Sequence, residues 1–388
     1  MELKAFSALY KDGYIFRSLY PVFWSPATNT ALSSAELEYK DDHISVSTFL
    51  AFHLDPNDRF PNGTKLIIWT TTPWTLVANQ AVAYNPSIQY LLMKSELGGH
   101  FLIGDFFLER FITLVPNSHV VGTFAGADLS NLLYTSPISK HTAPLLEAEF
   151  VTKEKGSGLV HVAPCHGRDD YFLGMKHQLP LTSFVNEKGI YTEAAGPHLQ
   201  GLDVLGEGTK KVLDLIEGDV LLMEEFKHSY PYDWRSLTPV ITRLSQQWFV
   251  DTTKIAPIAL QAYEKVQVYP AQMKNSMLSY ICNRPNWCIS RQRSWGVPIP
   301  VLFTSQDEPI VDHEFIEHVA ARVQQTGTSD FWFSDTLEQL VPQHFLHKWS
   351  LPYDDLQRGS DIFDVWFDSG LSWKALHDGR QADIYLEV

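Results

Sequence analysis

Apolar residues near the start of the chain recur at the spacing of one helix face. They are Leu3, Phe6, Leu9 and Tyr10, at positions i, i+3, i+6 and i+7. Residues 1 to 20 are therefore expected to be helical until Gly13 stops the run. The prolines of residues 21–26 then predict an extended segment.

The hydrophobic runs become shorter between residues 39 and 227. Gly, Pro and Asn separate apolar runs over residues 44–49, 65–71, 89–93, 100–103 and 158–162. Many short strands at this spacing favour a closed or nearly closed antiparallel barrel. One helix is expected within this region, over residues 206–216.

The pattern changes again after residue 227. Residues 228–235 indicate an irregular aromatic loop, and residues 239–243 indicate a strand. Helices over 254–265 and 313–325 alternate with strands near Trp287 and over 364–367, which is typical of α/β packing. We predict an α/β protein with an inserted β-barrel. Residues 41–227 form the barrel, and residues 1–40 and 228–388 belong to one interrupted α/β domain.

Composition narrows the class of protein. The 388 residues suit two or three domains, and a hydrophobic content of 45% supports a substantial core. The net charge of −15 excludes a general polyanion binder, but one basic groove can still be built from Arg284, Arg291 and Arg293.

The three cysteines, odd in number and without a CxxC spacing, argue against a disulfide framework or structural zinc and for a reduced, intracellular chain. No cleavable signal opens the sequence, and apolar runs too short to cross a membrane predict no membrane partner.

Two polar segments follow stiff apolar strands and carry the candidate chemistry. The first is Thr70-Thr71-Thr72 with Asn79 after it, and its simplest explanation is that threonines favour strands and Pro73 ends one. The second is residues 158–170, in which a broken strand leads into a helix that begins at an aspartate pair. An aspartate there can merely cap the helix. A metal site formed by its two histidines and an aspartate is another alternative.

The continuation of each segment resembles the editing site of isoleucyl-tRNA synthetase, a class I aminoacyl-tRNA synthetase. Residues 73–79 read Pro-Trp-Thr-x-x-Ala-Asn, and residues 156–170 read Gly-x-Gly-x-Val-His-x-Ala-Pro-x-His-Gly-x-Asp-Asp, with Val160 in the Val place. Val77 replaces the usual proline and Ser157 the common threonine. The resemblance implies that Asp170 holds the ammonium group of a misattached valine. It also implies that the ester, the terminal adenosine and the attacking water are positioned by Thr70, Thr71, Thr72, Asn79 and His161. It argues against the metal site of His161, His166 and Asp170, and no other metal is expected.

The flanking regions resemble the same family. Residues 284–300 match its Arg-Pro-x-Trp-Cys-Ile-Ser-Arg-Gln-Arg-x-Trp-Gly-Val-Pro-Ile-Pro run, and residues 228–235 match its Tyr-Pro-Tyr-Asp loop. The implied contacts to the tRNA acceptor end are Trp287, Arg291, Arg293 and Trp295. The implied isoleucine and adenylate contacts are Trp366 and Glu387, and Val388 stands where the family has glycine. For any few of these residues taken alone, a simpler explanation is that the aromatic side chains lie at the edge of the core and the arginines face solvent.

The resemblance implies a Rossmann-type catalytic domain plus the editing (connective peptide) domain. The intact enzyme would use ATP with magnesium to charge isoleucine tRNA and would hydrolyse mischarged valyl-tRNA. We expect a monomer whose partners are isoleucine tRNA, isoleucine and ATP, in the mitochondrial matrix in preference to the cytoplasm. The alternatives are a stand-alone trans-editing hydrolase, a non-catalytic tRNA- or protein-binding remnant and a metal-dependent hydrolase.

The sequence contains neither a His-x-Gly-His nor a Lys-Met-Ser-Lys-Ser motif, so it is expected to correspond to the central part of such an enzyme. Those motifs supply the groups that oppose charge on the transferred phosphates. We therefore predict that the 388-residue chain alone forms no isoleucyl-adenylate. Isoleucine-dependent pyrophosphate exchange measures this, and clear exchange above background would contradict it.

Overall fold

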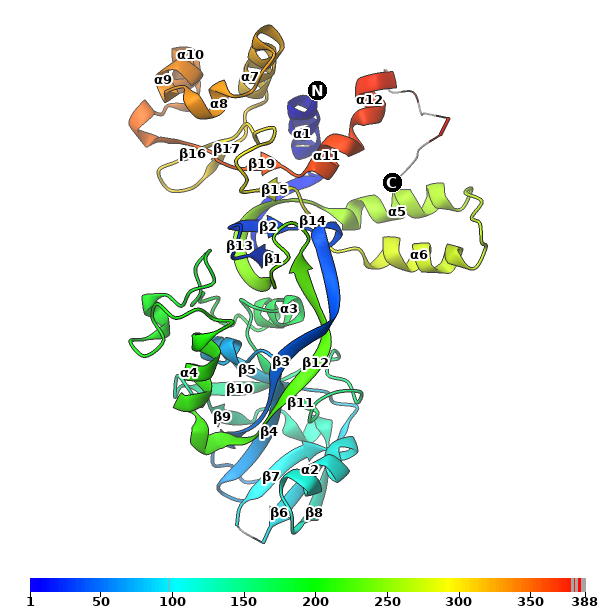
Figure 1. Ribbon diagram of the computed structural model, residues 1–388, viewed down its shortest axis with the longest axis vertical. Coiled ribbons are helices and arrows are strands. Elements are labelled where there is room, and N and C mark those ends of the chain that lie inside the picture. The colour runs from blue at the N-terminus through cyan, green and yellow to red at the C-terminus, as the bar shows by residue number, and fades with distance from the viewer. Residues whose placement is uncertain (97, 378–379, 381–382, 385–388) are drawn as a thin grey trace. The chain divides into compact units, whose positions relative to one another are not determined.

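The computed structural model describes residues 1–96, 98–377, 380 and 383–384 (Figure 1). The chain divides into two compact units that are each discontinuous in sequence. Unit 1 consists of Met1–Leu19, Thr30–Ala35 and Ser245–Val388, and unit 2 consists of Tyr20–Asn29 and Glu36–Leu244. Among the described residues, none of the helices combines the length and the apolar character that crossing a membrane requires.

Unit 2 is built on a ten-stranded mixed sheet. In spatial order its strands are β11 (Leu159–Val162), β5 (Ala81–Tyr84), β10 (Thr142–Glu147), β9 (Leu133–Thr135), β3 (Leu37–Leu54), β4 (Thr64–Thr70), β7 (His100–Gly104), β6 (Gln89–Ser95) and β8 (Ser118–Ala125), while β12 (Val220–Asp233) pairs with β3. The β10–β5 and β4–β7 pairs are parallel and the other pairs in this sheet are antiparallel. The combination of helices with a mixed sheet agrees with the predicted α/β class. The prediction that the strands of this region pair only antiparallel is wrong, because the β10–β5 and β4–β7 pairs are parallel.

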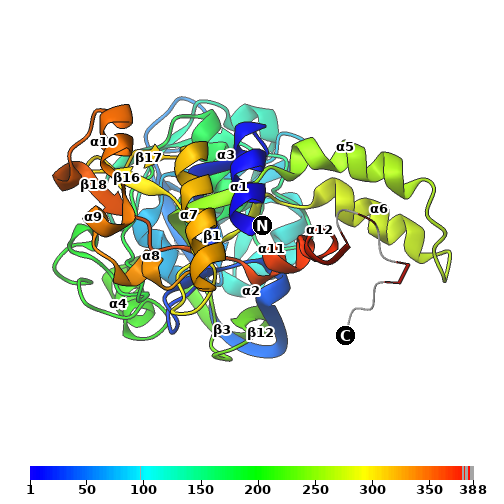
Figure 2. The same ribbon diagram turned by 90° about the horizontal axis from the view of Figure 1, so that it is seen from above.

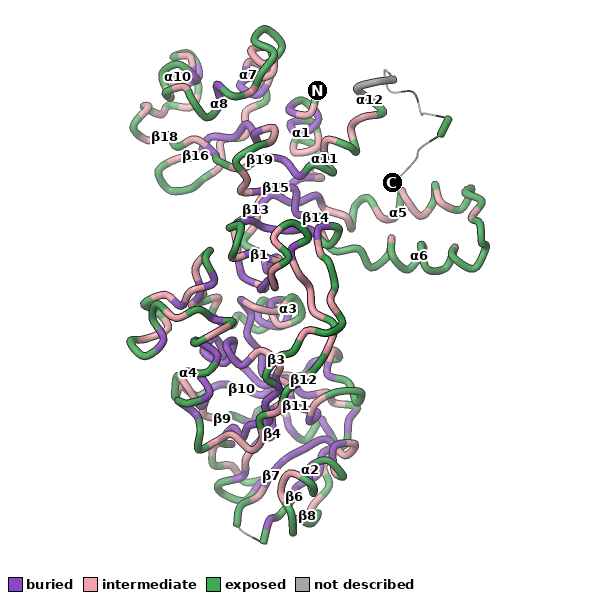
Figure 3. The backbone as a smooth tube through the Cα atoms, in the orientation of Figure 1, coloured by how far each residue is buried: buried purple, intermediate pink, exposed green. Residues whose placement is uncertain are grey.

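Buried apolar runs explain the centre of this sheet. β3 and β4 pair with Leu50 opposite Ile68 and Ala51 opposite Ile67, and these four side chains are almost fully buried. Figure 3 shows buried stretches of backbone, in purple, within this sheet. A strand buried on both faces has this continuous hydrophobic character. The helices of unit 2 are α2 (Leu108–Leu114), α3 (Arg168–Lys176) and α4 (Glu207–Leu215), with 3-10 turns η2 (Pro73–Ala78), η3 (Asp105–Phe107), η4 (Gly126–Leu129), η5 (Glu193–Ala195) and η6 (Glu217–Asp219). The helix predicted over 206–216 is confirmed as α4.

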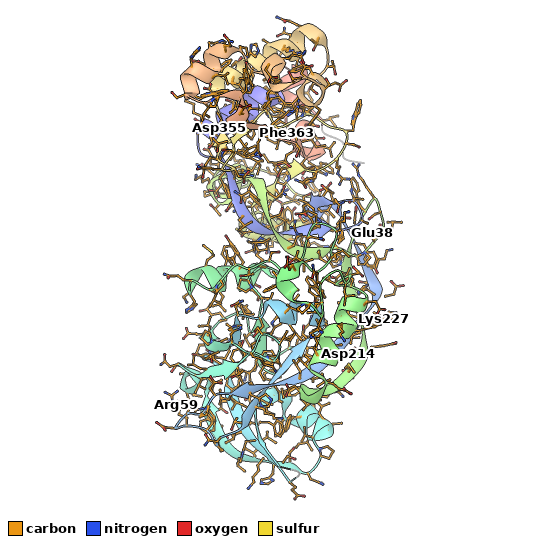
Figure 4. All side chains as sticks on the ribbon, turned by 90° about the vertical axis from the view of Figure 1, so that its left-hand side faces the viewer. Glu38, Arg59, Asp214, Lys227, Asp355 and Phe363 are labelled. Carbon is orange, nitrogen blue, oxygen red and sulfur yellow. The ribbon has the colours of Figure 1, made fainter. Side chains whose placement is uncertain are left out.

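The prediction of an irregular loop over residues 228–235 is wrong. Residues 228–233 continue β12, and only Trp234 and Arg235 lie in the turn that follows. β12 runs beside β3 as a long antiparallel ribbon (blue and green in Figure 1), and Figure 4 labels Glu38 and Lys227 on its two strands. Cross-strand rings hold the ribbon, since His43 stacks on Tyr230 with ring centres 4.2 Å apart. A bulge between His228 and Tyr230 accommodates the irregular sequence.

Unit 1 carries three smaller sheets and most of the helices. The strands that make up these sheets, two of which continue into unit 2, are β1 (Ile15–Ser25), β2 (Thr30–Leu32), β13 (Ile241–Val250), β14 (Trp287–Cys288), β15 (Ser290–Arg291), β16 (Leu302–Thr304), β17 (Pro309–Ile310), β18 (Leu356–Arg358) and β19 (Ile362–Phe363). The helices are α1 (Glu2–Lys11), α5 (Thr252–Tyr263), α6 (Met273–Asn283), α7 (His313–Thr326), α8 (Phe331–Ser334), α9 (Leu337–Leu340), α10 (Gln343–Trp349), α11 (Val365–Gly370) and α12 (Ser372–His377), with 3-10 turns η1 (Ser34–Glu36) and η7 (Tyr353–Asp355). The antiparallel pair α5 and α6 lies side by side in Figure 2.

The predicted helices at 254–265 and 313–325 are confirmed as α5 and α7. Two other boundaries are wrong. The first helix ends at Lys11, and residues from Ile15 onward form a strand because Gly13, at φ 74°, reverses the chain. The predicted strand over 364–367 is the start of α11, because Asp364 accepts a hydrogen bond from the Trp366 amide and caps that helix.

Candidate functional site

The threonine segment forms a tight turn at the end of a buried strand. Thr70 ends β4, and its Oγ1 accepts a hydrogen bond from the Thr72 amide at 3.1 Å. The Thr70 and Thr72 hydroxyl oxygens lie 3.4 Å apart, while Thr71 is half-buried. Pro73 then begins η2, where its fixed φ suits a first helical position. The turn therefore gathers hydroxyl groups at one point in unit 2.

His161 joins the two polar segments. It lies on β11, and its Nε2 is 2.7 Å from Thr75 Oγ1 while its Nδ1 is 3.3 Å from Asn79 Nδ2. Its neighbour Val162 accepts a backbone hydrogen bond from Gln80, because β11 pairs with β5 directly after the threonine turn. The structure thus brings together the two segments that the sequence singled out.

Burial keeps both histidines of the second segment neutral. The pKa of His161 is lowered to about 3, mainly because burial removes the ring from water and secondly because His166 lies nearby. Burial also lowers the pKa of His166 to about 4, although the hydrogen bond from its ring to the Thr242 carbonyl opposes that change. The His166 ring packs edge-on against Trp74, with ring centres 4.8 Å apart, which adds a second contact between the segments.

Asp170 occupies the first turn of α3 but bonds the preceding loop. Its Oδ2 accepts a hydrogen bond from the Ala163 amide at 2.9 Å. Gly167 leaves space for this carboxyl group, since a Cβ there would lie 2.9 Å from Asp170 Oδ2. Burial raises the pKa of Asp170 to about 7, partly offset by the Ala163 hydrogen bond. A carboxylate held in this way is suited to a cationic partner, whose charge would stabilise the ionised form.

Two residues of this network were not singled out from the sequence. Thr75 lies three positions after Thr72, inside the polar segment, so its spacing could have identified it. Tyr134, which donates to Asn79 Oδ1, lies on β9 more than 50 residues away in sequence, and no motif marks it.

The residues predicted to contact tRNA in unit 1 lie in different environments. Arg291 is buried and forms an ion pair with Asp364 at 2.7 Å, whereas Trp295 is 87% exposed. Trp287 is half-buried and donates to Asp364 at 2.8 Å. Arg293 is half-buried, and Trp366 is 39% exposed. Glu387 lies outside the described residues. The contacts of these residues with tRNA, isoleucine and adenylate remain predictions.

No group of three or more His, Cys, Asp or Glu side chains in the described part of the chain is arranged to hold a metal ion. The alternative site of His161, His166 and Asp170 meets a further obstacle. Both ring nitrogens of His161 already face Thr75 and Asn79. A metal ligand needs a free nitrogen lone pair, so His161 does not favour a metal centre.

Comparison with protein families and with curated proteins finds relatives along the whole chain. The family described as tRNA synthetases class I (I, L, M and V) matches residues 2–383. The whole chain is 41% identical to the mitochondrial isoleucine–tRNA ligase of Macaca fascicularis, 42% identical to that of Mus musculus and 40% identical to the isoleucine–tRNA ligase of Cyanothece sp.. The chain spans about 40% of the length of these relatives. Among solved structures, one titled "The crystal structure of GlLeuRS-CP1" matches 46% of the chain with a TM-score of 0.38 and 14% identity.

Proposed function

Because this chain belongs to the class I tRNA synthetases (I, L, M and V), we propose that unit 2 is an editing domain that hydrolyses valyl-tRNA carrying the isoleucine anticodon. One observation carries the proposal. His161 of one polar segment is hydrogen-bonded to Thr75 and Asn79 of the other, and Asp170 is anchored two residues beyond His161 at Ala163. Hydroxyl, amide and carboxyl groups from distant parts of the sequence are thereby gathered within one unit.

The chemistry of an aminoacyl ester suits this arrangement. The ester is already reactive, so a site that holds the substrate and orients a water molecule supplies most of the acceleration. An ionised Asp170 would bind the ammonium group of valine through a charge-assisted hydrogen bond. Thr70, Thr71 and Thr72 would position the ester, the terminal adenosine and the water. No activated side-chain nucleophile is required.

A need for hydrolysis follows from the limits of binding. Isoleucine and valine are the standard illustration of this limit, because the one methylene that separates them is worth only about 1–3 kcal/mol of discrimination. A second site that admits only the smaller product restores accuracy. Unit 2 would be that second site, and closure of its sheet into an inserted barrel remains a prediction.

For unit 1 we propose part of a Rossmann-type catalytic domain. In the intact enzyme it would serve ATP-dependent charging of isoleucine tRNA, with magnesium. Trp366 and Glu387 would lie at the isoleucyl-adenylate, and Trp287, Arg293 and Trp295 would face the acceptor end. The similarity to mitochondrial ligases favours a location in the mitochondrial matrix over the cytoplasm. We still expect the protein to be a monomer.

Hydrolysis of valyl-tRNA by the 388-residue chain tests the proposal. We expect the chain to release valine from isoleucine tRNA faster than it releases isoleucine from the same tRNA, and a chelator should not change the rate. Equal rates for the two substrates would contradict an editing role, as would a rate no higher than that of the uncatalysed ester. Binding of the tRNA without turnover would support the non-catalytic alternative, and loss of activity with the chelator would support the metal-dependent hydrolase.

A further inference from the structure

The orientation of the Asn79 side chain is fixed by a backbone carbonyl. Asn79 is fully buried, and its Nδ2 lies 3.0 Å from the Ala81 carbonyl oxygen, which can only accept a hydrogen bond. The atom facing Ala81 must therefore be the amide nitrogen. Its Oδ1 then faces the Tyr134 hydroxyl, which must donate. Burial raises the pKa of Tyr134 far above its ordinary value, so this hydroxyl keeps its proton.

The amide nitrogen of Asn79 also fixes one side of the His161 ring. It lies 3.3 Å from Nδ1 and carries hydrogens, so Nδ1 must be the unprotonated nitrogen that accepts. In the neutral imidazole the proton is then on Nε2. An imidazolium would direct an N–H at the Asn79 NH₂ group, which disfavours the charged form.

The opposite side of the ring gives the same answer independently. Thr75 Oγ1 lies 2.9 Å from the Thr72 carbonyl oxygen, and the hydroxyl has a single proton to donate there. Thr75 Oγ1 must therefore accept from His161 Nε2, 2.7 Å away. Two separate chains of hydrogen bonds, one ending at Ala81 and the other at Thr72, assign the proton to the same nitrogen.

We propose that Tyr134 is a positioning residue which, through Asn79, holds His161 as the neutral Nε2–H tautomer and so fixes the Thr72–Thr75 turn. This inference rests on the proposed editing function and adds a role to it. His161 has no free lone pair and no proton to spare, so it orients the turn and does not transfer a proton to or from the attacking water. Tyr134 suits the role because its ring is fully buried and stacks on Phe52, with ring centres 5.3 Å apart.

The variant Tyr134→Phe removes only the hydroxyl. Asn79 Oδ1 then lacks its donor, and the amide loses part of its hold on Nδ1. We expect the turnover number for valyl-tRNA hydrolysis to fall about tenfold with KM within about twofold, since a misplaced turn affects the reaction more than substrate capture. The matched control is Tyr90→Phe, because Tyr90 is also fully buried and donates to the Gly158 carbonyl but is not hydrogen-bonded to Asn79. That control should keep its turnover number within about twofold.

Nitrogen-15 spectra of labelled histidine in the full chain give a readout that does not depend on activity. At pH 7 we expect His161, assigned with His161→Asn, to show a protonated Nε2 and an unprotonated Nδ1. In Tyr134→Phe the His161 Nδ1 signal should shift, because the Asn79 amide then keeps only its hydrogen bond to the Ala81 carbonyl as an anchor. A protonated Nδ1 in the wild type would overturn the inference, as would a Tyr134→Phe spectrum identical to wild type at His161. If the wild type shows no hydrolysis, the editing function fails while the spectra still decide the tautomer and the role of Tyr134 in holding it.

Discussion

Replacing Asp170 with asparagine is expected to lower the rate of valyl-tRNA hydrolysis by about 100-fold. Truncating one partner of a buried, hydrogen-bonded charge pair costs about 2–5 kcal/mol. A 100-fold loss corresponds to about 2.7 kcal/mol, near the lower end of that range. Asparagine keeps the oxygen that accepts from the Ala163 amide, so the loop before α3 retains its anchor. What it lacks is the negative charge that would bind the ammonium group of valine.

The same variant is expected to stabilise unit 2 at high pH. The pKa of Asp170 is about 7 in the folded chain and near 3.8 when unfolded. Below pH 3.8 both states are protonated, and there is no penalty. Between pH 3.8 and 7 the unfolded state releases its proton first, so folding stability falls and the full penalty is present above pH 7. Asparagine does not titrate. The unfolding free energy of Asp170→Asn should therefore exceed that of wild type by an amount that grows with pH and reaches about 2 kcal/mol.

Urea unfolding of wild type and Asp170→Asn at pH 5 and pH 8 measures this difference. We expect the gain in unfolding free energy at pH 8 to exceed the gain at pH 5 clearly. Wild-type hydrolysis should also rise with pH through the region of pH 7, because the ionised carboxylate binds the amine. A variant that hydrolyses valyl-tRNA at the wild-type rate would remove Asp170 from the site. A stability difference that shrinks with rising pH would contradict the burial of its charge.

Replacing Arg291 with alanine is expected to destabilise unit 1 by about 3–5 kcal/mol. Removing one member of a buried ion pair leaves the other charge uncompensated, and both side chains here are at most 2% exposed. Asp364 also accepts a hydrogen bond from the Trp287 indole and caps α11. The guanidinium of Arg291 also donates to the carbonyls of Cys288 and Ser290 at 2.8 Å, so its loss leaves several buried acceptors without a donor.

Arg284→Ala is the matched control for that variant. Arg284 is exposed and its guanidinium lies over the Tyr280 ring. Replacing it with alanine removes the same charge as Arg291→Ala, but the lost contact contributes only about 1 kcal/mol or less to stability. Hydrogen exchange of α11 and β14 amides, followed by mass spectrometry, should show loss of protection in Arg291→Ala and little change in Arg284→Ala. Equal protection in the two variants would show that Arg291 is not a structural residue and would favour the predicted tRNA contact.

The sequence predicted the parts of this protein that local patterns determine. Buried strands such as β4 and β7 and the helices α5 and α7 follow from apolar runs and periodicity. The errors lie where a tertiary contact decides the local structure. Residues 228–233 have no strand alternation, but pairing with β3 makes them extended. Residues 365–367 are apolar and aromatic like a strand, but the carboxylate of the preceding Asp364 caps a helix there.

The candidate site divides in the same way. Thr70, Asn79, His161 and Asp170 were predicted because they lie in polar segments beside stiff apolar strands and because those segments resemble the editing motifs of a known family. The sequence could not show that Arg291 is buried, since an arginine in an Arg-rich stretch is normally solvated. It also could not reveal Tyr134, because the contact with Asn79 exists only after β9 enters the sheet. Spacing identifies residues on one segment, whereas their partners depend on strand order.

Binding of a non-hydrolysable valyl-adenosine amide by calorimetry tests the central claim most directly. The account predicts that wild type binds this compound at least tenfold more tightly than the same compound without its amino group. It predicts that Asp170→Asn loses that difference, and that the isoleucyl compound binds more weakly than the valyl one. Equal affinity of the wild type for the compounds with and without the amine would contradict the account.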